Sequence, residues 1–304
     1  MNYRHQFHAG NFADVLKHAV LLRLLRGMQM KEKGFLYLDS HAGRGGYDLE
    51  AAAGGQTLPR APEWPNGIGR LWDRRDLPPE LADYVEQVRL FDAAVRTATT
   101  STEADGGSLA ESGAGPRFYP GSPHLAQALM RAQDRTMFFE AHPDEAAALA
   151  QEFIGVRRVS VQALDGYTGV KAALPPPERR ALVLIDPPFE DRNEWTRILA
   201  AITAGLERLP AATIAVWYPL TTRAKLADFY RELMAIKTLP PCYTVELTVA
   251  GEESGLKMRG CAVLILNPPW GAEGSMRSIV RYLMPVLAQG PGAEGGLHWL
   301  VPEA

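Results

Sequence analysis

Apolar runs and helical stripes alternate along most of this 304-residue chain. Short runs rich in Val, Ile, Leu and aromatic residues predict strands, whereas apolar residues at helical spacing predict helices. The predicted strands span residues 35–39, 136–140, 158–162, 181–186, 213–217, 242–249, 261–267 and 297–301. The predicted helices span residues 12–30, 67–96 (with a break at the two prolines 78 and 79), 122–134, 144–153, 193–209, 222–236 and 274–288. This alternation predicts a doubly wound α/β fold with a mostly parallel sheet. The two late strands before residue 270 are joined by a turn, which predicts an antiparallel edge pair.

One stretch interrupts the alternation and is interpreted as a helical insertion. It begins with glycines and prolines, continues with a helical pattern, and includes Thr97–Gly115, which is low in complexity and has no aromatic residue. Such a composition predicts a disordered segment or a mobile surface loop. The chain is therefore divided into an N-terminal helix and first strand (1–47), the insertion (48–118, with its loop at 97–115) and the remainder of the core (119–304).

The strongest candidate site follows the apolar run Ala181–Ile185. The run leads directly into Asp186, two prolines and Phe189, and the prolines end the strand. In an open α/β sheet, ligands bind beyond the carboxyl ends of the strands, so Asp186 is predicted to point an acceptor into the site. A carboxylate, a turn carbonyl and an aromatic face suit a planar ring with an exocyclic amine. A simple turn is the alternative, but the buried strand before it favours a functional site.

A second stretch has nearly the same spelling. Leu264–Leu266 runs into Asn267, two prolines and Trp270. If its strand is antiparallel to the others, its carboxyl end lies at the opposite edge of the sheet. Asp186 is therefore predicted to be the catalytic residue rather than Asn267.

Three further strand ends carry groups suited to a nucleotide cofactor. Asp39 precedes the glycine-rich turn 40–47, an arrangement common in S-adenosylmethionine sites, although its spacing is not that of a dinucleotide fingerprint. Glu140 ends a strand where an acid can take ribose hydroxyls, and the Asp165-Gly166 turn can bind an adenine edge. The two cysteines lie far apart, so neither a metal site nor a disulfide is predicted.

Charge is uneven along a chain whose formal net charge is -3. Residues 1–33 contain six Arg or Lys against two acids, which leaves a net -7 for the rest. This basic segment suggests a phosphate-binding patch, and the alternative is the wet face of a helix. Lys17 and His18 flank the apolar stripe of the first helix and are predicted to lie at its rim. No apolar run is long enough to span a membrane and no signal-type core follows Met1, so a cytoplasmic protein is expected.

Taken together, these motifs resemble the RlmJ family of bacterial S-adenosylmethionine-dependent methyltransferases, which act on adenine N6 in 23S ribosomal RNA. The resemblance runs nearly end to end and is carried by Tyr3–His5, Phe7–Asn11, Ala13–His18, Tyr37–Asp39, His41–Gly43, Tyr119–Pro123, Asp165-Gly166, Ile185–Pro188 and Asn267–Trp270. It implies a Rossmann-like class I methyltransferase fold with a small helical insertion, S-adenosyl-L-methionine as cofactor and 23S ribosomal RNA as partner. Separately from the resemblance, a monomer without metal is expected.

The resemblance also implies residue roles. Cofactor contacts are implied for His18, His41, Ser122, Glu140, Asp165, Gly166 and Asp186. Asp186 would accept the amine proton, Tyr3 would reach the RNA, Lys17 would lie near the active site and hold phosphate, and Phe189 would stack on the base. Phe189 stands where the family more usually has Tyr, which keeps stacking but removes a hydroxyl. The alternatives are methylation of a DNA adenine or a protein glutamine, and a non-catalytic RNA-binding protein.

Overall fold

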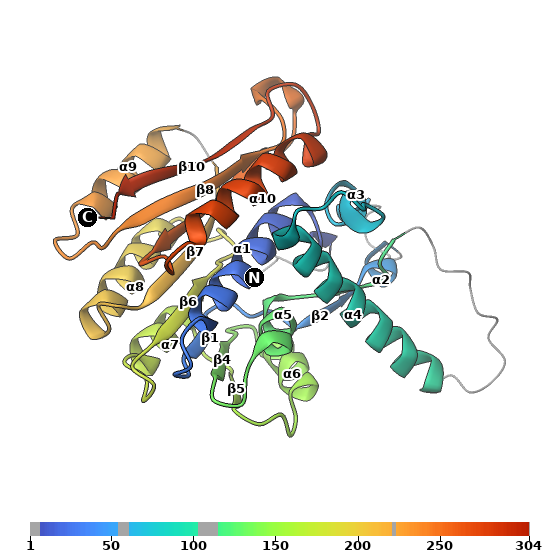
Figure 1. Ribbon diagram of the computed structural model, residues 1–304, viewed down its shortest axis with the longest axis horizontal. Coiled ribbons are helices and arrows are strands. Elements are labelled where there is room, and N and C mark those ends of the chain that lie inside the picture. The colour runs from blue at the N-terminus through green and yellow to red at the C-terminus, as the bar shows by residue number, and fades with distance from the viewer. Residues whose placement is uncertain (1–6, 54–60, 103–114, 221–222, 304) are drawn as a thin grey trace.

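A single eight-stranded sheet forms the centre of the protein (Figure 1). The computed structural model describes residues 7–53, 61–102, 115–220 and 223–303. The strand order is β10-β8-β9-β7-β6-β1-β4-β5. The parallel strands are β1 (Leu36–Asp39), β4 (Arg135–Phe139), β5 (Val159–Gln162), β6 (Ala181–Ile185) and β7 (Thr213–Pro219). The strands paired antiparallel are β8 (Cys242–Thr248), β9 (Gly260–Leu266) and β10 (Glu294–Val301).

Helices cover both faces of the sheet, and β6 shows why its sequence is apolar throughout. Leu182 and Leu184 join one hydrophobic core, whereas Ala181, Val183 and Ile185 join the other. A strand covered on both faces has no solvent side and needs no polar alternation. The first core includes α1 (Phe12–Gln29), α4 (Pro79–Thr102), α5 (Ser122–Leu129), α6 (Pro143–Glu152) and α10 (Ala272–Leu287). The second includes α7 (Gly166–Ala173), α8 (Glu194–Arg208) and α9 (Arg223–Met234).

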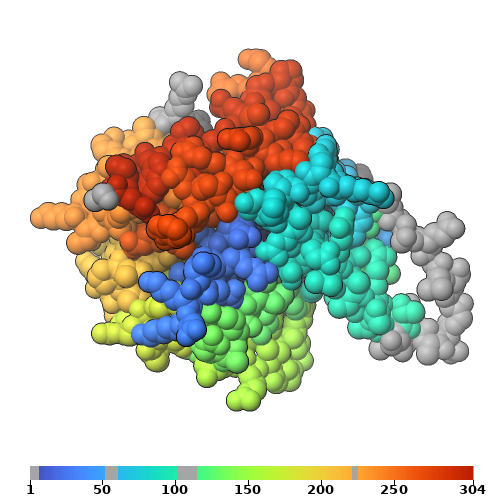
Figure 2. Space-filling view, viewed as in Figure 1, coloured from blue at the N-terminus to red at the C-terminus, as the bar shows by residue number. Residues whose placement is uncertain are grey.

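The insertion packs beside α1 and α10. It contains α2 (Leu49–Ala53), a short 3-10 helix η2 (Trp64–Asn66), α3 (Gly69–Trp72) and α4. In the space-filling view its surface adjoins those of α1 and α10 (Figure 2). Two short strands that the sequence did not predict, β2 (Gly46–Asp48) and β3 (Phe118–Pro120), pair antiparallel where the insertion leaves and rejoins the core.

Several predicted boundaries are corrected. α4 continues to Thr102, past the predicted helix end near residue 96, and the hydroxyls of Thr97, Thr99 and Thr100 donate to carbonyls four residues earlier. This bonding satisfies the hydroxyls within the helix. Residues 103–114 of the predicted loop lie outside the described residues. α7 was not predicted, because its two glycines lower its helix propensity.

The late strands follow the predicted direction. β8 and β9 form the expected antiparallel pair, and β10 adds to β8 as the outermost strand. β9 is also antiparallel to β7, with Leu266 opposite Ile214 near the start of β7. Asn267 therefore lies at the opposite edge of the sheet from Asp186, as predicted. Its side-chain amide donates to the carbonyls of Pro210 and Ala212, which gives it a structural role before β7.

Candidate active site

A cleft of about 1680 Å³ opens at the carboxyl ends of the parallel strands. Its walls come from the start of α1, the turn after β1, the segment after β6, insertion residues 61–66 and residues 255–259 between β8 and β9. Ligand pockets for one small molecule typically measure about 300–1,000 Å³. The cleft therefore has room for a nucleoside cofactor together with a second planar ligand.

The fold brings most of the predicted site residues to this cleft. Its lining includes Lys17, His18, His41, Ser122, Glu140, Asp186 and Phe189. Asp165 and Gly166 are not in the lining but lie beside it, at the start of α7. Tyr3 lies outside the described residues, so its predicted contact with RNA stays a prediction.

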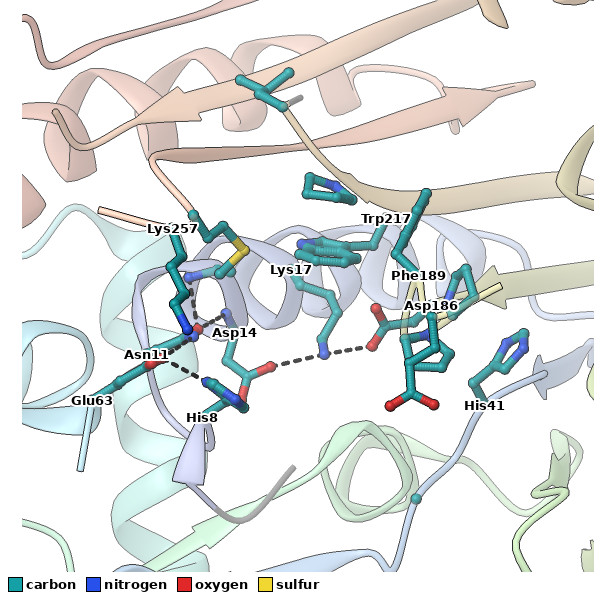
Figure 3. Close-up of a pocket in the computed structure, with 18 of the residues that line it drawn as sticks. His8, Asn11, Asp14, Lys17, His41, Glu63, Asp186, Phe189, Trp217 and Lys257 are labelled. Atoms are coloured by element: carbon teal, nitrogen blue, oxygen red, sulfur yellow. Dashed lines mark hydrogen bonds and ion pairs between the residues drawn. The ribbon is translucent and has the colours of Figure 1, made fainter. Parts of the chain in front are cut away.

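Lys17 is buried between two carboxylates (Figure 3). Its Nζ lies 2.8 Å from Asp14 Oδ1 and 2.6 Å from Asp186 Oδ2, and the residue is 5% exposed. Two predictions are corrected here, because Lys17 does not lie at a rim and its ammonium is not directed at RNA phosphate. His18 is also buried, and its Nδ1 is hydrogen-bonded to the Tyr119 hydroxyl at 2.8 Å. Lys17 and His18 of α1 are thus buried polar residues. The hydrophobic periodicity of the sequence cannot distinguish such residues from polar residues at the solvent-exposed margin of a helix.

The two carboxylates determine the protonation state of Lys17. Burial lowers the pKa of Lys17, but attraction and hydrogen bonding from Asp14 and Asp186 outweigh that effect and raise it well above its ordinary value. Lys17 therefore stays charged at neutral pH and cannot accept a proton from a substrate. It instead holds one oxygen of Asp186, and within the described residues the other oxygen accepts no hydrogen bond.

Asp39, which the sequence singled out as the acid before the glycine-rich turn, ends β1 and is fully buried. It accepts hydrogen bonds from the Tyr37 hydroxyl, the Ser122 hydroxyl and the His41 backbone N–H. Burial, together with a smaller effect of the nearby charge of Asp186, raises its pKa to about 6, although those hydrogen bonds lower it. Ser122 donates this bond from the first residue of α5, whereas the prediction made it the N-cap. The cap is Gly121, because the Ser122 hydroxyl is directed to Asp39.

Glu140 and Gly166 hold together the turns that follow the strands of the sheet. Glu140 Oε2 accepts from the Gly43 N–H at 2.9 Å, and its Oε1 accepts from the His142 N–H at 2.7 Å. Gly43 has φ of +62°, which favours glycine. A Cβ on Gly166 would lie 1.7 Å from the Ser40 carbonyl oxygen, so only glycine fits there. These contacts hold the turns together and leave acceptor capacity on Glu140.

Neutral and aromatic groups complete the site. Burial lowers the pKa of His41 to about 4, so its imidazole is neutral at neutral pH. Phe189 has φ of +53° and meets the rings of Trp195 and Trp217 edge to face, at 4.9 and 6.0 Å between centroids. Sequence reasoning missed the two tryptophans, because no local pattern links Trp195 on α8 or Trp217 on β7 to the motif. Their contacts hold the Phe189 ring beside Asp186.

The raised pKa of Asp39 should make the free energy of unfolding depend on pH. Its pKa of about 6 lies above the ordinary 3.8, so its contribution to folding is full below pH 3.8 and is lost as pH rises through 6. In Asp39→Asn this dependence is absent. The free energy of unfolding of the variant, relative to wild type, should therefore rise by about 2 kcal/mol between roughly pH 4.5 and 7.5. Urea unfolding across this pH range measures the free energy of unfolding of both proteins. If that free energy changed with pH to the same extent in wild type and in Asp39→Asn, the prediction would be contradicted.

The fold and the acid-ended strands around the cleft define a Rossmann-like methyltransferase. The chain matches the family model described as "Ribosomal RNA large subunit methyltransferase D, RlmJ" over residues 32–100 and 108–301, and it belongs to this family. This confirms the resemblance inferred from the sequence motifs.

Individual relatives match over the full chain. The "Ribosomal RNA large subunit methyltransferase J" proteins of Haemophilus influenzae and Escherichia coli are 37% and 35% identical to it over 303 residues, covering 100% of each chain. A crystal structure of a Legionella pneumophila protein is 31% identical, with a TM-score of 0.80 over 96% of this chain and 98% of that one. None of the helices in the described parts of the chain is long and apolar enough to cross a membrane.

Proposed function

We propose that this protein transfers a methyl group from S-adenosyl-L-methionine to N6 of an adenine in 23S ribosomal RNA. The observation that carries the proposal is the Asp186 carboxylate, which lines the cleft after β6 with one oxygen held by Lys17 and with Phe189 beside it. Family membership supports ribosomal RNA as the substrate. Because ribosomal RNA is made in the cytoplasm of bacteria, the same proposal gives the protein a cytoplasmic location.

The donor set of the cleft fits the proposed cofactor. S-adenosyl-L-methionine carries a cationic sulfonium, an ammonium group and two ribose hydroxyls. The cleft and its margin offer Asp39, Glu140, Asp165 and Asp186 at four neighbouring strand ends. Within the described residues no Lys or Arg forms an ion pair with Asp39, so this buried acid is suited to a positive ligand group. Ser122, His41 and Glu140 would hold the cofactor from the turns after β1 and β4 and from the start of α5.

In the proposed mechanism the protein positions the amine and removes its proton. The bound cofactor supplies a methyl group that is already activated by the adjacent sulfonium, so positioning provides most of the rate. The free oxygen of Asp186 accepts a hydrogen bond from the adenine amine and then takes the proton released by methyl transfer. Lys17 cannot compete for that proton because it remains charged. Phe189 stacks on the base, which must leave its stack in the RNA to enter the cleft.

Transfer of tritiated methyl groups to protein-free 23S RNA tests the proposal. Wild-type protein should yield N6-methyladenosine after nuclease digestion of the RNA. DNA of the same sequence and a glutamine-containing ribosomal protein serve as alternative substrates. Transfer to either of these in place of RNA would overturn the substrate assignment. Failure to bind S-adenosylhomocysteine would instead support a non-catalytic RNA-binding protein.

Removal of the Phe189 ring is expected to weaken binding of the RNA substrate. Stacking of a base on an aromatic ring contributes about 1–3 kcal/mol. Phe189→Ala should therefore raise the KM for RNA by about tenfold or more, while the Kd for S-adenosylhomocysteine stays within about twofold of wild type. Phe189→Tyr keeps the ring and should retain the wild-type KM. Steady-state kinetics with an RNA fragment would measure these values, and an unchanged KM in Phe189→Ala would remove the residue from the binding site.

A further inference from the structure

A continuous series of polar contacts leads from the insertion to the catalytic carboxylate (Figure 3). His8, Asn11 and Glu63 lie at one end of the labelled cluster, and Asp14 and Lys17 connect them to Asp186. We propose that Asp14 is a positioning residue, which holds Asp186 in place through Lys17 and is itself held in place by the insertion. This inference rests on the proposed function, because it takes Asp186 as the acceptor for the substrate amine.

Asp14 is fixed on both of its oxygens. Oδ2 accepts from the Gly10 backbone N–H at 3.0 Å, and Oδ1 accepts from Lys17 Nζ at 2.8 Å. The residue is 3% exposed. Asp14 and Lys17 lie three positions apart on α1, where side chains share one helical face. Asp14 therefore offers a rigid anchor for a side chain that is otherwise long and flexible.

Lys17 transmits this constraint across the cleft. Its ammonium is shared between Asp14 and Asp186, which belong to different elements and lie 172 positions apart in the chain. A lysine bound only to Asp186 could move together with it, because the lysine side chain has many rotamers. With Asp14 as a second partner, the ammonium has one position. The Asp186 oxygen bound to Lys17 is then fixed. Because the carboxylate is planar and rigid, the position of its second oxygen is restricted as well.

The insertion fixes the start of α1, where Asp14 lies. Asn11 caps the helix by accepting from the backbone N–H groups of Ala13 and Asp14, each at 3.0 Å. The Asn11 amide nitrogen donates to Glu63 Oε2 at 2.8 Å, which fixes the orientation of the capping group. His8 Nδ1 lies 3.0 Å from the same Glu63 oxygen. Glu63 of the insertion thereby orients the Asn11 side chain so that its oxygen caps α1 at Asp14.

Backbone packing makes this junction tight. The Ile68 N–H donates to the Gly10 carbonyl at 2.9 Å. A Cβ on Gly67 would lie 2.0 Å from the same carbonyl oxygen, so the two backbones touch. Gly10 in turn donates its own N–H to Asp14. This contact gives the insertion a role that does not require it to touch the substrate, because it braces the loop that holds Asp14.

Asp14→Asn tests the proposal, with Asp134→Asn as a matched control. Asp134 is also a buried aspartate, and it likewise accepts from a backbone N–H, that of Phe35, and from a cation, Arg131. It precedes β4, at the opposite edge of the sheet from the cleft. In Asp14→Asn, kcat should fall about 10- to 100-fold, while the KM for RNA and the Kd for S-adenosylhomocysteine change less than about twofold. Asp134→Asn should lose thermal stability without a comparable fall in kcat.

The pH profile separates positioning from a purely structural effect. Among the described residues, the titratable groups that interact with Lys17 are Asp14, Asp186, Cys261 on β9 and Tyr84 on α4. Burial raises the pKa of the Cys261 thiol and of the Tyr84 phenol, so both groups are neutral. Removal of one of the two carboxylates allows burial to lower the pKa of Lys17. Activity of Asp14→Asn should therefore decline as pH rises toward 10, whereas wild type and Asp134→Asn should not show this decline.

A second readout needs no RNA. The ¹⁵N resonance of the Lys17 ammonium, identified by its absence in Lys17→Met, should titrate at a lower pH in Asp14→Asn than in wild type. An active wild type together with an unchanged kcat in Asp14→Asn would overturn the positioning role. If wild type methylates no RNA, the proposed function fails. The Lys17 titration still tests whether Asp14 acts on Lys17: a lower pKa of Lys17 in Asp14→Asn supports this coupling, and an unchanged pKa refutes it.

Discussion

Asp186→Ala is expected to lower kcat for methyl transfer to 23S RNA by at least about a hundredfold, the contribution typical of a positioned proton acceptor. The variant loses the proposed acceptor for the substrate amine and also a partner of Lys17. Tritiated methyl transfer at saturating S-adenosyl-L-methionine measures the effect. Binding of S-adenosylhomocysteine, measured by calorimetry, shows that the cofactor pocket remains formed.

Asn267→Ala is the matched control, because it removes the polar residue of the second Pro-Pro-aromatic motif. Its side chain bonds to two carbonyls before β7, so the variant should lose stability and keep its kcat. Full activity in Asp186→Ala, with loss of activity in Asn267→Ala, would reverse the assignment of the two motifs.

Lys17→Met is expected to lower kcat by about a hundredfold and also to destabilise the protein by about 3–5 kcal/mol at neutral pH. The side chain is of similar length, but the variant leaves Asp14 and Asp186 without the cation that both of them contact. Two largely buried carboxylates then lie close together with no ammonium between them, which is the reason for the expected loss of stability.

Arg26→Met provides the control on the same helix. Arg26 is partly exposed and pairs with Asp83 on α4, so its loss should cost less than about 1 kcal/mol and leave kcat unchanged. Steady-state kinetics and urea unfolding at pH 7.5 would compare wild type, Lys17→Met and Arg26→Met. If Lys17→Met matched Arg26→Met in both assays, the ammonium would have neither an active-site role nor a role in stability.

The sequence was sufficient to predict the elements that depend on local pattern. The apolar run before Asp186 is a strand covered on both faces, as its composition predicted, and the prolines end it there. The direction of β9 followed from its short connection to β8, and this was enough to separate Asn267 from the cleft. The cofactor contacts predicted for His18, His41 and Ser122 came from the family resemblance, because single polar residues have no periodic signal of their own.

Other features could not be obtained from local pattern. α7 has too many glycines to be recognised as a helix, and it forms because Val170 and Tyr167 pack into the second core. Asp39 could be identified as the acid at a strand end, but its raised pKa depends on complete burial by segments remote in sequence. Propensity and spacing describe neighbours along the chain, whereas burial depends on which segments meet.

By itself, the sequence determined the eight strands of the large sheet, most of the helices, the doubly wound fold, the family, and the strand end that carries Asp186. These follow from periodicity, from chain breakers and from motif spelling, all of which are local. Only the tertiary structure decided that Lys17 is an ion-pair partner rather than a phosphate ligand, and that Glu63 of the insertion braces the start of α1. Lys17 and Asp186 lie 169 positions apart, and their contact exists only because α1 packs across the end of β6.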